Sequence, residues 1–294
     1  MIKCIATDMD GTLLNGKMDV SEQNREAIKK AQSEGVEVIV ATGRSYSEAR
    51  FALDEADIDC PIICANGAEV RDEFGNIVSQ AYMEKSQVHD IYQILKEMNL
   101  YYELYTNQET YTANYEAALD IMVDVYLTAH TEVPREEIRE AAKERFTKGH
   151  VHLVDDYQQV IDDESQFIYK FLVFSFDKDE LEETASRLNR IARLTVSSSG
   201  SENLELTHCD AQKGIALERF VDKKGIKLEE TMAIGDNFND VSMLEKVGRS
   251  VAMGNALPEI KAICDYETSS NDEDGVAEAI IQALTTDTRT IEKR

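Results

Sequence analysis

Blocks of apolar and polar positions along the chain predict strands that alternate with helices. Near the start, apolar runs at 2–6, 36–41 and 62–65 are separated by segments of helical spacing at 21–34 and 45–56. Strand, helix, strand, helix, strand is the order of a doubly wound parallel sheet. The same order returns later, with strands predicted at 231–235 and 250–253 and helices at 212–224, 239–247, 258–264 and 275–284.

The middle of the chain has a different pattern. A hairpin is predicted at 68–83. Beyond it, helices are predicted at 87–98, 115–129, 135–146 and 179–191, and strands at 101–112, 167–176 and 194–198. We interpret this block as an inserted α+β domain, although an extension of the main sheet stays open. The predicted fold is therefore α/β, with a doubly wound core at 1–83 plus 202–294 and an inserted domain at 84–201.

Composition excludes several classes of partner. The chain carries 31 Lys and Arg against 57 Asp and Glu, a net charge of −26. Such a chain has no basic field with which to neutralise a nucleic-acid backbone or an anionic membrane surface. A site for a phosphorylated molecule would have to be made locally, by a bound metal, a lysine or helix N-termini. We expect no obligate protein partner.

The cysteines and the apolar runs bear on location. The five cysteines are odd in number and show no metal-ligand spacing. We expect buried free thiols, which suit a reducing compartment. The chain starts with a strand pattern and no basic leader segment, and its apolar runs are too short to span a bilayer. We expect a cytoplasmic protein.

Candidate chemistry begins at Asp8 and Asp10, directly after the first predicted strand. In a continuing strand these side chains would point to opposite faces, but Gly11 interrupts it and lets both turn toward one point. Two carboxylates this close raise each other's pKa unless a cation lies between them, and Mg²⁺ is the first candidate. The stretch predicts a metal-assisted nucleophile beside a second carboxyl for proton transfer.

Two other readings of this stretch are open. An EF-hand calcium loop also starts Asp-x-Asp, but it needs Gly at its sixth position and Glu at its twelfth, where this chain has Leu13 and Asp19. A solvated acidic turn would fit equally well if the stretch stood alone. The rest of the chain has to decide between the enzyme and the turn.

Four short signatures stand in one order along the chain: Asp8-x-Asp10, Thr42-Gly43, Lys213 and Asp236-x-x-Asn239-Asp240. This order resembles motifs one to four of the haloacid dehalogenase-like (HAD) phosphohydrolases. The long block between the second and third signatures resembles the type IIB cap of that superfamily. Ala-Asn-Gly-Ala at 65–68 and Ala-Met-Gly-Asn-Ala at 252–256 resemble further signatures of its Cof-type branch.

The resemblance implies roles for three carboxylates. Asp8 resembles the nucleophile that becomes the aspartyl-phosphate, and it would also bind Mg²⁺. Asp10 resembles the general acid and base, and it would contact the metal through its backbone carbonyl. Asp236 resembles the second protein carboxylate on the metal.

The resemblance also implies a phosphate site, with contacts from Met9 (through its backbone amide), Thr42, Gly43, Lys213 and Asn239. Supporting residues would be Asp240, Asn237 and Arg44. Taken singly, several of these residues have another reading. Thr42 could be a helix cap, Lys213 a surface lysine and Asp236 a turn residue. Arg44 could form a surface ion pair instead of meeting substrate.

The implied function is a Mg²⁺-dependent phosphatase that hydrolyses small phosphorylated metabolites through an aspartyl-phosphate. The family's range covers sugar phosphates, pyridoxal phosphate, FMN and flavin precursors, and the inserted domain would set selectivity. Tyr101, Tyr102 and Tyr105 could stack on a flat substrate ring or pack in the core of that domain. The alternatives are a phosphomutase of the same superfamily and a non-catalytic regulator that binds a phosphometabolite.

Overall fold

The computed structural model describes residues 1–129 and 134–291. It divides into two compact units, which we call the core unit (Met1–Gln80 with Asp210–Arg294) and the inserted unit (Ala81–Cys209). Both boundaries differ from the prediction: the first lies at 80/81 instead of 83/84, and the second at 209/210 instead of 201/202. Residues 203–208 form a strand that pairs with its neighbours in the inserted unit, so they do not belong to the core unit.

The core unit is built on an eight-stranded sheet in the order β14-β13-β12-β1-β2-β3-β4-β5. Its strands are β1 (Cys4–Thr7), β2 (Glu37–Ala41), β3 (Ile62–Cys64), β4 (Glu69–Arg71), β5 (Ile77–Gln80), β12 (Thr231–Gly235), β13 (Arg249–Ala252) and β14 (Tyr266–Glu267). The strands from β14 to β3 are parallel, and β4 and β5 add an antiparallel edge. β1 is buried along its whole length, as expected for a central strand covered on both faces.

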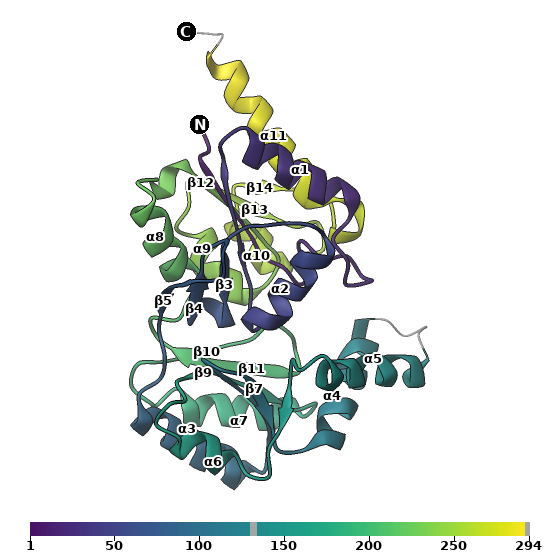
Figure 1. The fold of residues 1–294 in the computed structure, drawn as a ribbon, viewed down its shortest axis with the longest axis vertical. Coiled ribbons are helices and arrows are strands. Elements are labelled where there is room, and N and C mark those ends of the chain that lie inside the picture. The colour runs from purple at the N-terminus through teal and green to yellow at the C-terminus, as the bar shows by residue number, and fades with distance from the viewer. Residues whose placement is uncertain (130–133, 292–294) are drawn as a thin grey trace. The chain divides into compact units, whose positions relative to one another are not determined.

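Two helix pairs flank this sheet, α1 with α11 and α8 with α9 (Figure 1). The helices are α1 (Glu22–Ser33), α2 (Tyr46–Glu55), α8 (Lys213–Lys223), α9 (Val241–Leu244), α10 (Pro258–Ile263) and α11 (Gly275–Ile291). Ser21 caps α1 by accepting from Asn24 N, and the helix buries Ala27, Ile28 and Ala31. The predicted fold class, α/β with a parallel sheet, is therefore confirmed.

Two helices of the core unit differ from their predicted bounds by more than two residues. α9 is shorter than the predicted 239–247, because a 3₁₀ turn at Phe238–Asp240 precedes it. α11 extends beyond 284 to Ile291. Every helix in the described residues is too short or too polar to cross a lipid bilayer.

The inserted unit has its own six-stranded sheet, in the order β10-β11-β9-β6-β7-β8, and so does not extend the sheet of the core unit. Its strands are β6 (Tyr101–Thr106), β7 (Thr110–Thr112), β8 (His152–Leu153), β9 (Ile168–Phe174), β10 (Leu194–Ser197) and β11 (Asn203–His208). Its helices are α3 (Lys85–Met98), α4 (Tyr115–Ala129), α5 (Arg135–Thr147), α6 (Tyr157–Asp162) and α7 (Lys178–Leu188). Within this unit α3, α6 and α7 lie along one side of the sheet, and α4 packs on α5 (Figure 1).

Candidate active site

Three of the predicted site segments begin where neighbouring strands of the core unit end. Asp8 follows β1, Thr42 follows β2 and Asp236 follows β12. Because β12, β1 and β2 are adjacent and parallel, their carboxyl ends lie at the same edge of the sheet. Open α/β sheets bind their ligands at this edge. Side chains that are far apart in the sequence therefore meet there.

Lys213, the first residue of α8, has a fully buried side chain. Its ammonium group donates to Asp8 Oδ1 at 2.5 Å and to Asp240 Oδ1 at 2.7 Å. Burial alone would lower the pKa of Lys213, but the charges of Asp240 and Asp8 outweigh it and raise the pKa. The lysine is therefore charged, and its reading as a surface lysine is wrong.

The residue after the lysine lets α8 approach α9 closely. Gly214 N donates to Ser242 Oγ at 3.0 Å. A Cβ added at Gly214 would lie 1.8 Å from the backbone oxygen of Ser242, so any other residue would force the two helices apart. Glycine thus permits the packing that brings Lys213 to Asp8.

Three carboxylates form a group at this place. One oxygen each of Asp8, Asp236 and Asp240 lies within 4.8 Å of the other two. Burial, and then the charges of the neighbouring carboxylates, raise the pKa of Asp8 well above its usual range and that of Asp236 to about 7. Like charges held this close, with Asp8 and Asp240 buried and Asp236 half-buried, favour a cation between them.

The oxygens that remain available decide whether this group suits a divalent ion. Asp240 is occupied: Oδ1 accepts from Lys213, and Oδ2 accepts from the backbone N–H groups of Asp236 (2.9 Å) and Asn237 (3.1 Å). Asp8 and Asp236 each commit only Oδ1 to hydrogen bonds among the described residues. Their two Oδ2 atoms fit a hard cation such as Mg²⁺, while Asp240 holds the turn and the lysine.

Thr12, which has no predicted role, orients one of these carboxylates. Its hydroxyl donates to Asp236 Oδ1 at 2.9 Å, across a sequence separation of 224 residues. The preceding Gly11 has φ of +76°, a left-handed conformation that favours glycine. A Cβ at Gly11 would lie 2.6 Å from Asp236 Oδ2, so this position must stay small for Asp236 to keep its place.

Gly11→Ala is expected to disturb Asp236 directly, and Gly35→Ala is its matched control. Gly35 has a similar φ of +81°, but a Cβ there meets nothing within 4 Å. Both variants should lose about 1 kcal/mol of stability from the left-handed backbone. Only Gly11→Ala should also weaken Mg²⁺ binding, measured by isothermal titration calorimetry. Equal Mg²⁺ affinities in the two variants would contradict a cation site at Asp236.

The Asp10 carboxylate is turned toward Arg44 and is not a member of the three-carboxylate group. Arg44 Nε donates to Asp10 Oδ1 at 3.2 Å and Oδ2 at 2.9 Å, and Arg44 Nη2 donates to Oδ1 at 2.6 Å. The ion-pair reading of Arg44 is therefore correct, and its partner is a predicted catalytic residue. Asp10 could serve a metal here only through its backbone.

The turn that carries Thr42 and Gly43 leads from β2 to α2. Thr42 is fully buried, and its hydroxyl oxygen accepts from Arg44 N at 3.1 Å. The residue that caps α2 is Ser45, whose side chain accepts from Glu48 N, so the reading of Thr42 as a helix cap is wrong. The phosphate contacts of Thr42 and Gly43 stay predictions.

The other predicted residues lie in the same loops. The Met9 side chain is fully buried, so a phosphate contact from Met9 would come from its backbone. Asn237 Oδ1 accepts from Phe238 N at 2.8 Å and stabilises the 3₁₀ turn. Asn239 Nδ2 donates to Asn66 Oδ1 at 3.4 Å.

Two residues that support these loops were not singled out from the sequence. Asn66 is buried, has φ of +57° and donates its backbone N–H to Thr42 O at 3.0 Å. Asn255 Nδ2 donates to Gly11 O at 2.8 Å. Both stand in the short signatures at 65–68 and 252–256, which could have pointed to them, but their partners are fixed only by tertiary contacts.

Tyr102 and Tyr105 of β6 are buried, and Tyr101 is half-buried. Tyr102 is buried, and its ring stacks on Tyr157 with ring centres 4.2 Å apart, so the packing reading is correct for Tyr102. Lys170 Nζ lies 4.4 Å from the centre of the Tyr105 ring. Stacking of Tyr101 or Tyr105 on a substrate stays a prediction.

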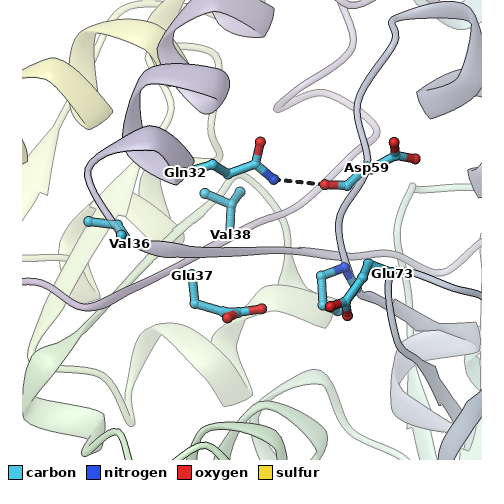
Figure 2. A pocket seen from close by; sticks show the side chains of 8 residues that line it. Gln32, Val36, Glu37, Val38, Asp59 and Glu73 are labelled. Atoms are coloured by element: carbon cyan, nitrogen blue, oxygen red, sulfur yellow. Dashed lines mark hydrogen bonds between the residues drawn. The ribbon is translucent and has the colours of Figure 1, made fainter.

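A hollow of ≈ 250 Å³ lies at the other end of β2, where the strand begins (Figure 2). Its lining includes the acidic residues Glu37, Asp59 and Glu73. Gln32 Nε2 donates to the backbone oxygen of Asp59 at 2.7 Å on its rim. The carboxylates of these three acidic residues would repel a phosphate, so this hollow does not compete with the carboxyl edge as a phosphate site.

Comparison with known proteins agrees with this geometry. The family model described as haloacid dehalogenase-like hydrolase matches residues 5–280. Two Bacillus subtilis proteins are similar over nearly their whole length. Phosphatase YwpJ is 39% identical over 94% of this chain and 98% of its own. 5-Amino-6-(5-phospho-D-ribitylamino)uracil phosphatase YwtE is 36% identical over 96% of this chain and 98% of its own.

A solved structure is also similar to nearly the whole of this chain. A haloacid dehalogenase-like hydrolase from B. subtilis superposes with a TM-score of 0.88 at 38% identity, over 95% of this chain and 99% of that one. The resemblance noted in the motifs is thus confirmed by sequence and by fold. The chain belongs to the haloacid dehalogenase-like hydrolase family, and it is a phosphoric monoester hydrolase.

Proposed function

We propose that the protein is a Mg²⁺-dependent phosphatase of small phosphorylated metabolites that works through an aspartyl-phosphate on Asp8. The observation that carries the proposal is the buried ion pair of Asp8 with Lys213, set beside Asp236 at the carboxyl edge of the sheet. A cation held by Asp8 and Asp236 would neutralise charge on the transferring phosphoryl group and on the carboxylate that attacks it. Asp8 would supply the nucleophile, Asp10 the group for proton transfer, and Lys213 a fixed positive charge.

In the first step an Asp8 oxygen attacks phosphorus and forms a new P–O bond. The ester P–O bond breaks and leaves its electron pair on the substrate oxygen, which takes a proton from the Asp10 carboxyl. The products are the alcohol, the aspartyl-phosphate and the Asp10 carboxylate. Lys213 keeps Asp8 in place and offsets negative charge throughout.

In the second step water attacks the same phosphorus. Asp10 takes a proton from the water, the bond between phosphorus and the Asp8 oxygen breaks, and inorganic phosphate leaves. Asp8 is again a carboxylate and Asp10 is again protonated, so the cycle closes. A phosphomutase would return the phosphoryl group to the substrate, and the chemical product therefore separates the two reactions.

Removal of divalent metal is expected to abolish phosphate release, because Asp8 and Asp236 would then repel both each other and the substrate. The measurement is inorganic phosphate released from p-nitrophenyl phosphate after treatment with EDTA, followed by titration with Mg²⁺. Activity should return with Mg²⁺ and not with an equal ionic strength of NaCl. Full activity in EDTA would contradict the metal assignment.

For the substrate we propose a flavin-pathway phosphate, because YwtE, 36% identical to this chain, is named for such a compound. The inserted unit would select it. The free cysteines suit the reducing cytoplasm where such intermediates occur. A panel of 5-amino-6-(5-phospho-D-ribitylamino)uracil, FMN, pyridoxal phosphate and sugar phosphates tests the proposal. It is supported by the highest kcat/KM on the first compound, and contradicted by a higher value on a sugar phosphate.

A further inference from the structure

We infer that Arg44 is a positioning residue for Asp10: its guanidinium group fixes the carboxylate of the proton-transfer residue in one orientation, away from the carboxylates that would hold the cation. This inference rests on the function proposed above. It assigns to Arg44 a task that is separate from binding substrate. The observation behind it is the side-on ion pair between the two residues.

The ion pair constrains the carboxylate more than an ordinary surface contact would. Both Asp10 oxygens accept from the same planar guanidinium group, at 2.6–3.2 Å. A planar fork of this kind fixes the plane of the carboxylate as well as its position, which the single charge of a lysine cannot do. Among the described residues Arg44 is the hydrogen-bond partner of the Asp10 carboxylate, so nothing else described sets its orientation.

Arg44 is itself held on both sides of its backbone. Its N–H donates to Thr42 Oγ1 at 3.1 Å, and its carbonyl oxygen accepts from Ala65 N at 2.8 Å. The next residue, Ser45, begins α2 with a reciprocal pair of hydrogen bonds to Glu48. The base of the arginine side chain is therefore rigid, although the side chain remains about one-fifth exposed (22%).

The backbone of the Asp10 loop is held as well, which leaves the side chain as the part that needs a partner. Leu14 N donates to Met9 O at 2.9 Å, and Asn255 Nδ2 donates to Gly11 O at 2.8 Å. The Asp10 side chain is nearly half exposed (48%). Without Arg44 it would be free to rotate in solvent or toward the cation site.

The ion pair thus keeps two kinds of carboxylate apart. Asp8 and Asp236 have oxygens available for a cation, whereas Asp10 is held by a guanidinium group and stays out of their group. An Asp10 oxygen bound to the cation would be committed to it and held away from the leaving group, so it could not exchange a proton there. Arg44 keeps the Asp10 carboxylate outside the cation site.

The test is a double-mutant cycle between Arg44→Met and Asp10→Asn, on the preferred alkyl phosphate with saturating Mg²⁺. If Arg44 acts through Asp10, Arg44→Met should lower kcat about 10²-fold in the native background. It should have almost no further effect in Asp10→Asn, and KM should change little in either background. A rise in KM of equal size in both backgrounds would overturn the inference and assign Arg44 to substrate binding.

A second measurement separates the two chemical steps. The p-nitrophenolate leaving group needs no proton, so the burst of p-nitrophenol should persist in Arg44→Met while steady-state turnover falls, because hydrolysis of the aspartyl-phosphate still needs Asp10 as base. Arg44→Lys, which keeps the charge and loses the fork, should behave like Arg44→Met. Native kinetics in Arg44→Lys would overturn the inference, since charge alone would then suffice.

Arg50→Met is the matched control. Arg50 forms an ion pair with Asp54 in α2, also through Nε and Nη2, outside the candidate site. Its kinetics should equal those of the native protein. If the native protein itself shows neither a burst nor turnover on any phosphate, the proposed function is wrong, and the inference about Arg44 falls with it. A failure of this inference alone leaves native turnover intact.

Discussion

Asp8→Asn is expected to fold normally and to lose turnover by about 10³-fold or more, as expected when a covalent nucleophile is removed. An amide does not form an acyl phosphate at a useful rate. Its oxygen can still accept the hydrogen bond that Lys213 donates to Asp8 Oδ1, so the buried contact is preserved. The measurement is kcat for phosphate release, together with the thermal unfolding midpoint.

The control for this variant is Asp19→Asn, which changes an exposed carboxylate near the same loop. It should keep the native kcat. Acid quenching during turnover should trap a phosphorylated form of the native protein and of the control, and no such form of Asp8→Asn. A native rate in Asp8→Asn, or a phosphorylated form of it, would refute the assignment of Asp8 as nucleophile.

Lys213→Met is expected to lower the free energy of unfolding by about 3–5 kcal/mol in the absence of metal, because it leaves buried carboxylates without their cation. Lys213 donates to both Asp8 and Asp240, and none of the three side chains has appreciable contact with solvent. Turnover should fall as well, since the charge that offsets the site is gone. Urea denaturation in EDTA gives the stability, and Mg²⁺ should restore part of it.

A second substitution tests the cause of this loss. In Lys213→Met/Asp240→Asn one buried negative charge is removed together with the positive one. The double variant should therefore lose less unfolding free energy than the two single variants lose when their losses are added. Lys17→Met, at an exposed position, should be as stable as the native protein. If the stability losses of the two single variants simply add in the double variant, Lys213 does not stabilise the protein by compensating buried negative charge.

The sequence by itself determined the elements of the core unit and the identity of the chemical groups. The strands that the apolar pattern predicts end at Thr7, Ala41 and Gly235 in the structure, and polar residues follow each of them. These signals are local, because a strand or a helix is recognised from the spacing of its own residues. That is why the predicted bounds mostly agree with the structure, and why Asp8, Thr42 and Asp236 lie directly after strands, as predicted.

Tertiary structure alone decided which of these groups touch. Thr12 and Asp236 make contact because β12 pairs with β1, and nothing in the spacing along the chain encodes that pairing. The same holds for residues 203–208. They were predicted as part of the core, but they complete the sheet of the inserted unit by pairing with β9 and β10.

The charge environment of the site also became visible only in three dimensions. On composition alone a lysine is expected at the surface, yet Lys213 is fully buried between two carboxylates. Asp10 and Asp8 look equivalent in the sequence, but only one of them is paired with an arginine. Burial and pairing depend on neighbours contributed by distant segments, and those neighbours separate the grouped carboxylates Asp8 and Asp236 from Asp10, which pairs with Arg44.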